Sequence, residues 1–229
     1  MTQQTHRIAV LASGHGSNLQ ALIDAIGQAI LAAELVGVFS DRPAAGALQR
    51  AQAAGVPALA IRAADFPTRL AFDEYLFSRI DRVHPDLIVC AGYMRLLSER
   101  EVIARMGRMI NIHPSLLPAF KGLRTHQQAL EAGVAEHGAS IHFVSPELDG
   151  GPVISQARVP VLADDDAGSL GRRVLEREHS LLVQTLRLFT QGRIELRANQ
   201  VAFDGLTLDS PLQLGPDDLL DIPTSRNPA

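Results

Sequence analysis

The sequence predicts a doubly wound α/β fold, in which helices cover both faces of a mostly parallel, Rossmann-like sheet. Short apolar runs alternate with segments of helical periodicity through most of the chain. The early runs, such as Ile8–Leu11, are apolar at every position, as in strands that are buried on both faces. Near residues 139–161 two further strands flank the turn PELDGGP, which predicts an antiparallel hairpin at one edge of the sheet.

The first half of the chain predicts four strands and three helices. Ser17 and Gln20 have the spacing of a capping box, so we expect the first helix to begin at Ser17. Its apolar residues share one face. The expected elements are the strand Ile8–Leu11, a helix bearing Leu19, Leu22, Ile23, Ile26 and Ile30, the strand Leu35–Phe39, a helix capped by Gly55, the strand Val56–Ile61, a helix bearing Phe72, Leu76, Ile80 and Val83, and the strand Leu87–Ala91.

The second half predicts three more strands and a long amphipathic helix. The expected elements are the strand Met109–Ile112, a short helix Gln127–Glu131, the strands Ala139–Val144 and Val153–Val161, and a helix from Ser169 to about Thr190. We expect residues 1–208 to form a single domain. Residues 209–229 are rich in Pro, Asp and Ser and lack periodicity, which predicts a poorly ordered tail.

Composition narrows the classes of protein that fit. The 229 residues are 46% hydrophobic with a formal net charge of −4, and only 4% are aromatic. This balance argues against a nucleic-acid partner, and no apolar run approaches the length of a membrane helix. The eight histidines and the single Cys90 form no metal-ligand pattern, and Cys90 is predicted to be a buried, unreactive residue. The start MTQQTHRIAV has no secretory segment, so a cytoplasmic protein with small-molecule partners is expected.

The turn after the first strand, ASGHGSNLQALI at residues 12–23, has the features of a phosphate loop. Gly14 and Gly16 allow a tight turn, and the N–H groups of Ser17 and Asn18 would point at an anion. The motif lacks the third glycine of a dinucleotide fingerprint and the lysine of a P-loop. Asp41 does lie where a dehydrogenase has its ribose-binding acid. A phosphate on a small substrate fits this loop better than a pyrophosphate, although a turn without a ligand remains an alternative.

A second polar group follows a strand in the stretch RMINIHPSLLP, residues 108–118. Asn111 and His113 are two positions apart on the strand, so they point to the same side, and ligands bind at the carboxyl ends of strands in open α/β sheets. Asp149, in a turn made sharp by Gly150 and Gly151, is the candidate carboxylate partner of the imidazole. His142 alternates with apolar neighbours, and whether it reaches this site is left open.

Four segments together make the chain resemble the folate-dependent phosphoribosylglycinamide formyltransferases. They are ASGHGSNLQALI, AGYMRLLS (residues 91–98), NIHPSLLPAFKGLRTHQQALEAG (111–133) and HFVSPELDGGPVISQ (142–156). The resemblance spans about residues 7–200. Methionyl-tRNA formyltransferases resemble the chain near NIHPSLLP but continue differently and carry an RNA-binding domain. His15 departs from the family pattern, where asparagine is frequent, and the tail after residue 209 has no counterpart.

The resemblance implies a formyltransferase fold and transfer of a formyl group from 10-formyltetrahydrofolate to the amine of 5-phosphoribosylglycinamide, a step of purine biosynthesis without a metal. It implies that Asn111 and a cationic His113 stabilise an oxyanion, with Asp149 holding the imidazolium. Its other implied contacts are Gly16, Ser17, Asn18 and Glu178 with the ribonucleotide, and Arg69, Met94, Arg95, Leu96, Leu97 and Asn111 with the folate. The segment 118–133 would be a mobile lid.

Several alternatives stay open at this point. Another enzyme that uses 10-formyltetrahydrofolate would share the motifs, namely a formyl-folate hydrolase or a sugar-nucleotide formyltransferase. A nicotinamide-dependent oxidoreductase would use the glycine loop for pyrophosphate, and a non-catalytic phosphosugar sensor would bind without turnover. The sequence allows a monomer or a homodimer, and it leaves open whether His126 contributes to the site.

Overall fold

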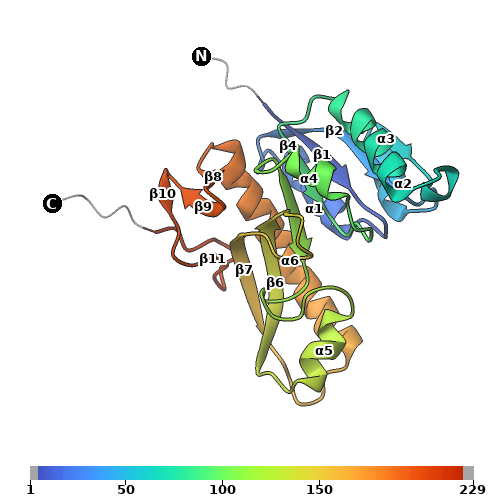
Figure 1. The fold of residues 1–229 in the computed structure, drawn as a ribbon. Helices are drawn as coiled ribbons and strands as arrows, with labels where there is room; N and C mark the ends of the chain where they lie inside the picture. The colour runs from blue at the N-terminus through green and yellow to red at the C-terminus, as the bar shows by residue number, and fades with distance from the viewer. Residues whose placement is uncertain (1–4, 224–229) are drawn as a thin grey trace.

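The computed structural model describes residues 5–223 and contains an eight-stranded sheet flanked by helices, together with a separate three-stranded sheet (Figure 1). The elements in chain order are β1 (His6–Leu11), α1 (Ser17–Gly27), β2 (Ala33–Ser40), α2 (Gly46–Ala53), β3 (Ala58–Ala60), the 3-10 turn η1 (Ala63–Asp65), α3 (Arg69–Asp81), β4 (Leu87–Cys90), α4 (Glu99–Ile103), β5 (Met109–His113), α5 (Thr125–Glu131), β6 (Glu136–Phe143), β7 (Val153–Pro160), α6 (Ala167–Thr190), β8 (Ile194–Arg197), β9 (Gln200–Phe203), β10 (Leu206–Thr207) and β11 (Leu212–Gln213).

The large sheet has the strand order β11-β7-β6-β5-β4-β1-β2-β3. Only β6 runs against its neighbours, pairing antiparallel with both β5 and β7, while the other neighbouring strands are parallel. The predicted mostly parallel α/β fold is therefore confirmed. The β6–β7 hairpin does not form the edge, however, because β11 adds one more parallel strand outside β7.

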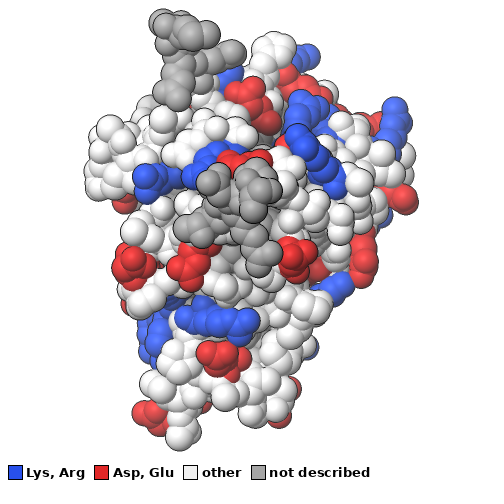
Figure 2. Space-filling model, turned by 90° about the vertical axis from the view of Figure 1, so that its left-hand side faces the viewer, with Lys and Arg blue, Asp and Glu red and all other residues white. Residues whose placement is uncertain are grey.

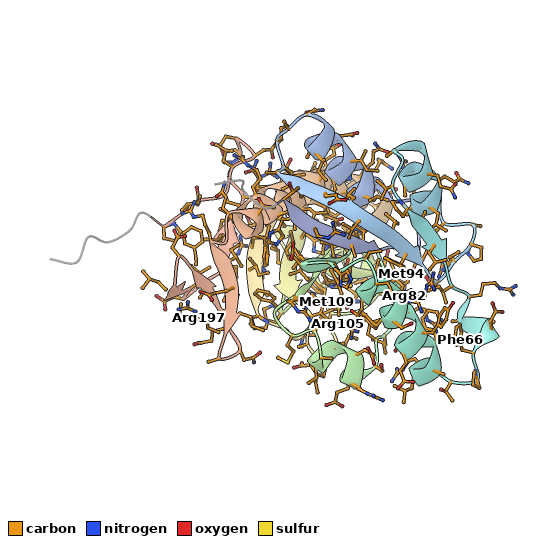
Figure 3. All side chains as sticks on the ribbon, turned by 90° about the horizontal axis from the view of Figure 1, so that it is seen from above. Phe66, Arg82, Met94, Arg105, Met109 and Arg197 are labelled. Atoms are coloured by element: carbon orange, nitrogen blue, oxygen red, sulfur yellow. The ribbon has the colours of Figure 1, made fainter. Side chains whose placement is uncertain are left out.

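Each face of the sheet buries its own apolar cluster. In β1, Ile8 and Val10 belong to the cluster that includes residues of α1, α2 and α6. Ala9 and Leu11 point the other way, into the cluster that α3 completes. Figure 3 shows α1 and α2 on one side of the strands and α3 and α4 on the other. This alternation along one fully buried strand is what the continuous apolar runs of the sequence predict.

The order of the strands reverses between β1 and β4. From β1 the chain adds β2 and then β3 on one side, whereas β4 and β5 lie on the other side of β1. At such a switch point the loops leave the carboxyl ends of the strands in opposite directions and open a crevice, which is where ligands bind in folds of this type. The loops that follow β1, β4 and β5 all begin at this carboxyl edge of the sheet.

The prediction of a poorly ordered tail is wrong for residues 209–223. Leu212, Leu214 and Leu220 are buried against the core, and β11 pairs with β7. Arg177 of α6 binds the carboxylate of Asp218 and donates hydrogen bonds to two backbone carbonyls of the segment. Three leucines separated by polar residues are too few for a periodicity signal, yet they cover the edge of the sheet. Residues 224–229 lie outside the described part of the chain.

Four other elements were not predicted, and one predicted cap is wrong. The helix α4 has five residues, and the strands β8–β10 are two to four residues long, which is too short for a clear period. Arg197, in β8, lies on the opposite side of the molecule from Phe66 (Figure 3).

Helix α1 does begin at Ser17, but its N-cap is Gly16 and there is no capping box. Gln20 instead binds Asp24 and Arg50 through its side chain.

The surface carries both signs of charge. On the face shown in Figure 2, acidic and basic side chains are interspersed rather than gathered into a basic tract. Of the helices within residues 5–223, none combines the length and the apolar character needed to cross a membrane.

Candidate active site

Antiparallel pairing of β5 and β6 places His142 directly opposite Asn111. The side chain of His142 is buried, and this burial lowers the pKa of its imidazole to about 4, so the ring is neutral near pH 7. Its Nδ1 lies 2.9 Å from the carbonyl oxygen of Phe143, which can only accept, so the hydrogen is on Nδ1. Nε2 is then the acceptor for the Asn111 amide at 3.1 Å. His142 therefore fixes the orientation of Asn111, and the second amide hydrogen has no partner among residues 5–223.

Asp149 lies between two imidazoles, those of His113 and His142. Its Oδ2 is 3.6 Å from His113 Nδ1, and its Oδ1 is 3.7 Å from His142 Nε2. Both separations are longer than a hydrogen bond, so the expected direct bond between Asp149 and His113 is not formed here. Oδ2 instead accepts a hydrogen bond from the Gly122 backbone N–H at 2.8 Å. The structure thus brings the three predicted residues together, with Asp149 close to His113 but not hydrogen-bonded to it.

The turn that carries Asp149 is shaped by close backbone contact. Asp149 has a φ of 45° and only 10% of its side chain is exposed, so the carboxylate points inward. A Cβ atom at Gly151 would lie 1.8 Å from the carbonyl oxygen of Phe143, a position that only glycine can occupy. The turn can therefore approach β6 and present the carboxylate beside His142.

The predicted lid, residues 118–133, lies across the His113 side of this cluster. His113 Nε2 donates a hydrogen bond to the carbonyl of Phe120 at 3.0 Å, and Lys121 pairs with Glu147 at 2.7 Å. His126, on α5, lies 3.1 Å from His137 rather than in the cavity beside Asn111. Burial lowers the pKa of His137 to about 4. Movement of the segment remains a prediction.

A cavity of about 120 Å³ joins this polar cluster to the loop after β4. Its walls include Asn111, His142 and Asp149 on one side and Arg95, Leu96 and Leu97 on the other. Met94 and Arg69, both predicted to contact folate, do not line it. Ligand pockets usually measure about 300–1,000 Å³, so a ligand of folate size would extend from this cavity over the surface. A larger cavity of about 510 Å³ lies around Asp86, before β4, and contains no predicted site residue.

The predicted phosphate loop connects β1 to the N-terminus of α1. Gly16 has a φ of 81°, and a Cβ atom there would lie 2.6 Å from the Cα of Ala47, so this position needs glycine. Gly14 has open space around it and no such requirement. The exposed His15 turns its ring toward Arg50, 3.2 Å from the guanidinium. Ser17 and Asn18 open the helix, where the first backbone N–H groups have no partner within the helix and can bind an anion.

Asn18 also contacts Glu178, a residue 160 positions away on α6. The amide nitrogen of Asn18 donates to Glu178 Oε2 at 2.7 Å. Burial raises the pKa of Glu178 to about 7, and the hydrogen bond from Asn18 only partly opposes that rise. The Oδ1 atom of Asn18 has no hydrogen-bond partner among residues 5–223. Two residues predicted to hold the ribonucleotide therefore meet beside the phosphate loop.

Three features define the class of enzyme: a phosphate loop, a polar cluster at the end of β5, and a turn that points the Asp149 carboxylate inward. The chain belongs to the formyl transferase family, whose sequence profile, described as "Formyl transferase", matches residues 6–186.

Particular relatives narrow the class. The chain is 46% identical over 201 residues to a protein of Escherichia coli (strain K12) named "Phosphoribosylglycinamide formyltransferase", covering 88% of this chain and 95% of that protein. It is also similar to the structure of the phosphoribosylglycinamide formyltransferase from Coxiella burnetii, with a TM-score of 0.86, 46% identity, and coverage of 90% of this chain and 96% of the other. A formyltetrahydrofolate deformylase from Pseudomonas syringae is 25% identical with a TM-score of 0.80, covering 87% of this chain and 66% of the deformylase.

Proposed function

We propose that the protein transfers the formyl group of 10-formyltetrahydrofolate to the amine of 5-phosphoribosylglycinamide, in the synthesis of purines. The observation that carries this proposal is a single cavity in which Asn111, His142 and Asp149 face the segment 95–97, at the edge of the sheet where the phosphate loop also ends. The high identity to relatives named for this reaction supports the same assignment over most of the chain.

The reaction begins when the amine attacks the formyl carbon, which forms a C–N bond and places negative charge on the formyl oxygen. The free amide hydrogen of Asn111, whose other hydrogen is held by His142, is placed to bind that oxygen. A cationic His113 would supply the second donor once its Nε2 leaves the Phe120 carbonyl. Preorganised donors of this kind are worth about 10²–10³-fold each in rate.

Collapse of the tetrahedral intermediate breaks the bond between the formyl carbon and N10 of the folate. The attacking nitrogen loses a proton and the leaving N10 gains one, so the protons balance without a metal or a redox step. Asp149, beside both imidazoles, stabilises the cationic form of His113 and is placed to pass a proton between the two nitrogens.

The ribonucleotide would be held at its phosphate by the N–H groups of Ser17 and Asn18, next to the close turn at Gly16. Glu178 would bind its ribose and glycinamide part. Because the pKa of Glu178 is about 7 in the free protein, the residue exchanges easily between an acid that donates a hydrogen bond and a carboxylate that accepts one. The folate would lie along the segment 94–97, with Arg69 at its outer end.

A formyl-folate hydrolase is the second candidate, because a formyltetrahydrofolate deformylase has a similar fold. A nicotinamide-dependent oxidoreductase is disfavoured by Asp41, which accepts a hydrogen bond from Ser13 at 2.6 Å and is committed inside the protein rather than free for a ribose.

The test is to incubate the protein with 10-formyltetrahydrofolate, with and without 5-phosphoribosylglycinamide, and to follow folate absorbance and formate release. Formyl transfer predicts that tetrahydrofolate accumulates only when the ribonucleotide is present and that no formate appears. Formate release without the ribonucleotide would instead identify a hydrolase. An absence of any change in both samples would contradict the proposal.

A further inference from the structure

The segment Met94–Ser98, between β4 and α4, forms one wall of the cavity. The backbone N–H and C=O groups of Arg95, Leu96 and Leu97 make no hydrogen bond with any residue in the described range 5–223. Backbone polar groups in a wall of this kind are available to a ligand, since they would otherwise need protein partners or water. Because residues 95–97 make no backbone hydrogen bonds within the described chain, other groups must hold this segment in place.

Asp41 and Ser13 hold the first end of the segment. The Ser13 hydroxyl oxygen accepts a hydrogen bond from the Met94 N–H at 2.9 Å and donates to Asp41 Oδ1 at 2.6 Å. A serine hydroxyl has one hydrogen, so the carboxylate of Asp41 fixes that hydrogen and directs a lone pair at Met94. The side chain of Asp41 is only 6% exposed. The contact ties the ends of β1, β2 and β4 together at the switch point.

Asp73, on α3, holds the other end. Its side chain is fully buried, and Oδ2 accepts a hydrogen bond from the Ser98 N–H at 2.7 Å. Ser98 is the N-cap of α4 and its side chain makes no cap hydrogen bond, so the bond from its backbone N–H to Asp73 is what fixes the start of the helix against α3. Burial raises the pKa of Asp73, and the bond from Ser98 and the charges of Arg69 and Arg95 oppose that rise. Oδ1 of Asp73 has no partner among residues 5–223, so hydrogen bonding within the fold does not fully account for this buried acid.

The arginine between these two anchors is also placed by α3. The guanidinium of Arg95 lies 5.0 Å from the ring centroid of Phe72, the residue before Asp73. Figure 3 shows Met94 on the same side of the molecule as Phe66, the residue that packs against Phe72, and away from Arg197. Residues 94–98 are thus held at both ends, and the Arg95 side chain packs on Phe72. The backbone groups of residues 95–97 have no partner among residues 5–223 and are available to a ligand.

We propose that Asp41 and Asp73 are positioning residues that clamp the two ends of the segment Met94–Ser98 and so hold its free backbone groups in place for the folate. This inference rests on the proposed formyl transfer. Neither carboxylate touches the reacting atoms, so both should act on folate binding and leave the chemical step largely unchanged.

The test compares alanine and asparagine at each position in the full chain. Asp73→Ala removes the acceptor for the Ser98 N–H, and we expect the KM for 10-formyltetrahydrofolate to rise about tenfold or more, with the ribonucleotide KM and kcat each changed less than about threefold. Asp73→Asn keeps an amide oxygen for that N–H and should recover most of the affinity. Asp41→Ala should likewise raise the folate KM with kcat changed less than about threefold, and Asp41→Asn should recover most of the affinity.

Glu101→Ala is the matched control, since the side chain of Glu101, a buried acid on α4, binds Arg105 at 2.6 Å and makes no hydrogen bond to the segment among residues 5–223. Its backbone N–H does donate to the Ser98 carbonyl, and alanine keeps that bond. It should lower the thermal midpoint and leave the folate KM unchanged. Binding of tetrahydrofolate, measured by titration calorimetry, should weaken in the Asp73→Ala and Asp41→Ala proteins only. The proposed role of Asp41 and Asp73 would be contradicted if all three alanine variants lost folate affinity equally. It would also be contradicted if Asp41→Ala and Asp73→Ala kept the parent's folate KM. An inactive parent would instead reject the proposed function, while tetrahydrofolate binding would still test the clamp.

Discussion

Among single residues, Asp149 offers the sharpest test of the reaction chemistry. Asp149→Asn preserves the size of the side chain and an acceptor for the Gly122 N–H, so the turn should fold. The imidazole of His113 loses its anionic neighbour at 3.6 Å, so positive charge on the ring is less stabilised during the reaction. We expect kcat to fall about 10²-fold or more with modest changes in both KM values, the pattern of an interaction made in the transition state.

The matching double variant shows whether the two side chains act as one unit. If they do, the kcat losses of Asp149→Asn and His113→Ala should be strongly non-additive in a double-mutant cycle. Fully additive losses, or an Asp149→Asn enzyme with the parent's kcat, would be incompatible with the mechanism.

Glu178 gives a second prediction at this scale, because the fold raises its pKa from 4.5 to about 7. An acid with a raised folded-state pKa contributes stability that is fully present below about pH 4.5 and is lost as the pH rises through about 7. The shift corresponds to about 3 kcal/mol in the free energy of unfolding. We therefore expect Glu178→Gln, which resembles the protonated acid, to have a higher thermal midpoint than the parent at pH 8 and an equal one at pH 4.5.

The control for this prediction is Glu176→Gln, an exposed acid two residues earlier on the same helix. It should change the midpoint little at either pH. A Glu178→Gln protein with no advantage at pH 8 would show that the folded protein tolerates the Glu178 carboxylate without cost.

Among the elements, β11 and its flanking residues give a prediction that the sequence alone did not. Truncation after Leu208 removes the strand that pairs with β7 and three buried leucines, Leu212, Leu214 and Leu220. Each buried leucine contributes up to about 1.5–3 kcal/mol, so the thermal midpoint should fall by roughly 5 °C or more. Thermal unfolding followed by circular dichroism would measure this.

Point variants separate burial from chain length in the same segment. Leu214→Ala removes a side chain that is 7% exposed and should lower the midpoint, while Leu219→Ala, at a residue that is 51% exposed, should not. If both behave like the parent, the segment does not dock in solution.

The elements that the sequence predicted are those with a strong period and an extended apolar pattern. The buried strands of the parallel sheet and the long helix α6 belong to this group. The sequence missed α4 and β8–β10 because two to five residues carry no measurable period. Whether His142 reaches the site was left open for another reason. The alternation with Ile141 and Phe143 places His142 on one face of the strand, but only the register with β5 puts it opposite Asn111. Long-range pairing of this kind has no local signature.

The same limit applies to the contacts that build the site. The 3.6 Å gap between His113 and Asp149, and the bond from Asn18 to Glu178 on α6, depend on how distant elements pack. The motifs indicated which residues would gather at the carboxyl edge of the sheet, and the packing decides which atoms face one another.

At the scale of the whole molecule, several buried titratable groups together set how stability depends on pH. His137 and His142 have their pKa lowered to about 4 by burial, and burial also lowers the pKa of His126 and His179. A histidine with a lowered folded-state pKa is neutral in the fold but takes up a proton when the chain unfolds. Its contribution is therefore complete above pH 6.5 and is lost as the pH falls toward 4.

Glu178 changes the free energy of unfolding in the opposite direction over the same pH range, so the net pH dependence is the difference between the two contributions. Between pH 7 and 4.5, His137 and His142 together lose about 5 kcal/mol, while Glu178 regains about 2–3 kcal/mol. We expect the free energy of unfolding to fall by about 2–3 kcal/mol across that range, which lowers the thermal midpoint by roughly 5–10 °C. Glu178→Gln should about double the fall, because it removes the opposing contribution. A midpoint that stays constant or rises between pH 7 and 4.5 would mean that the buried imidazoles are protonated in the fold.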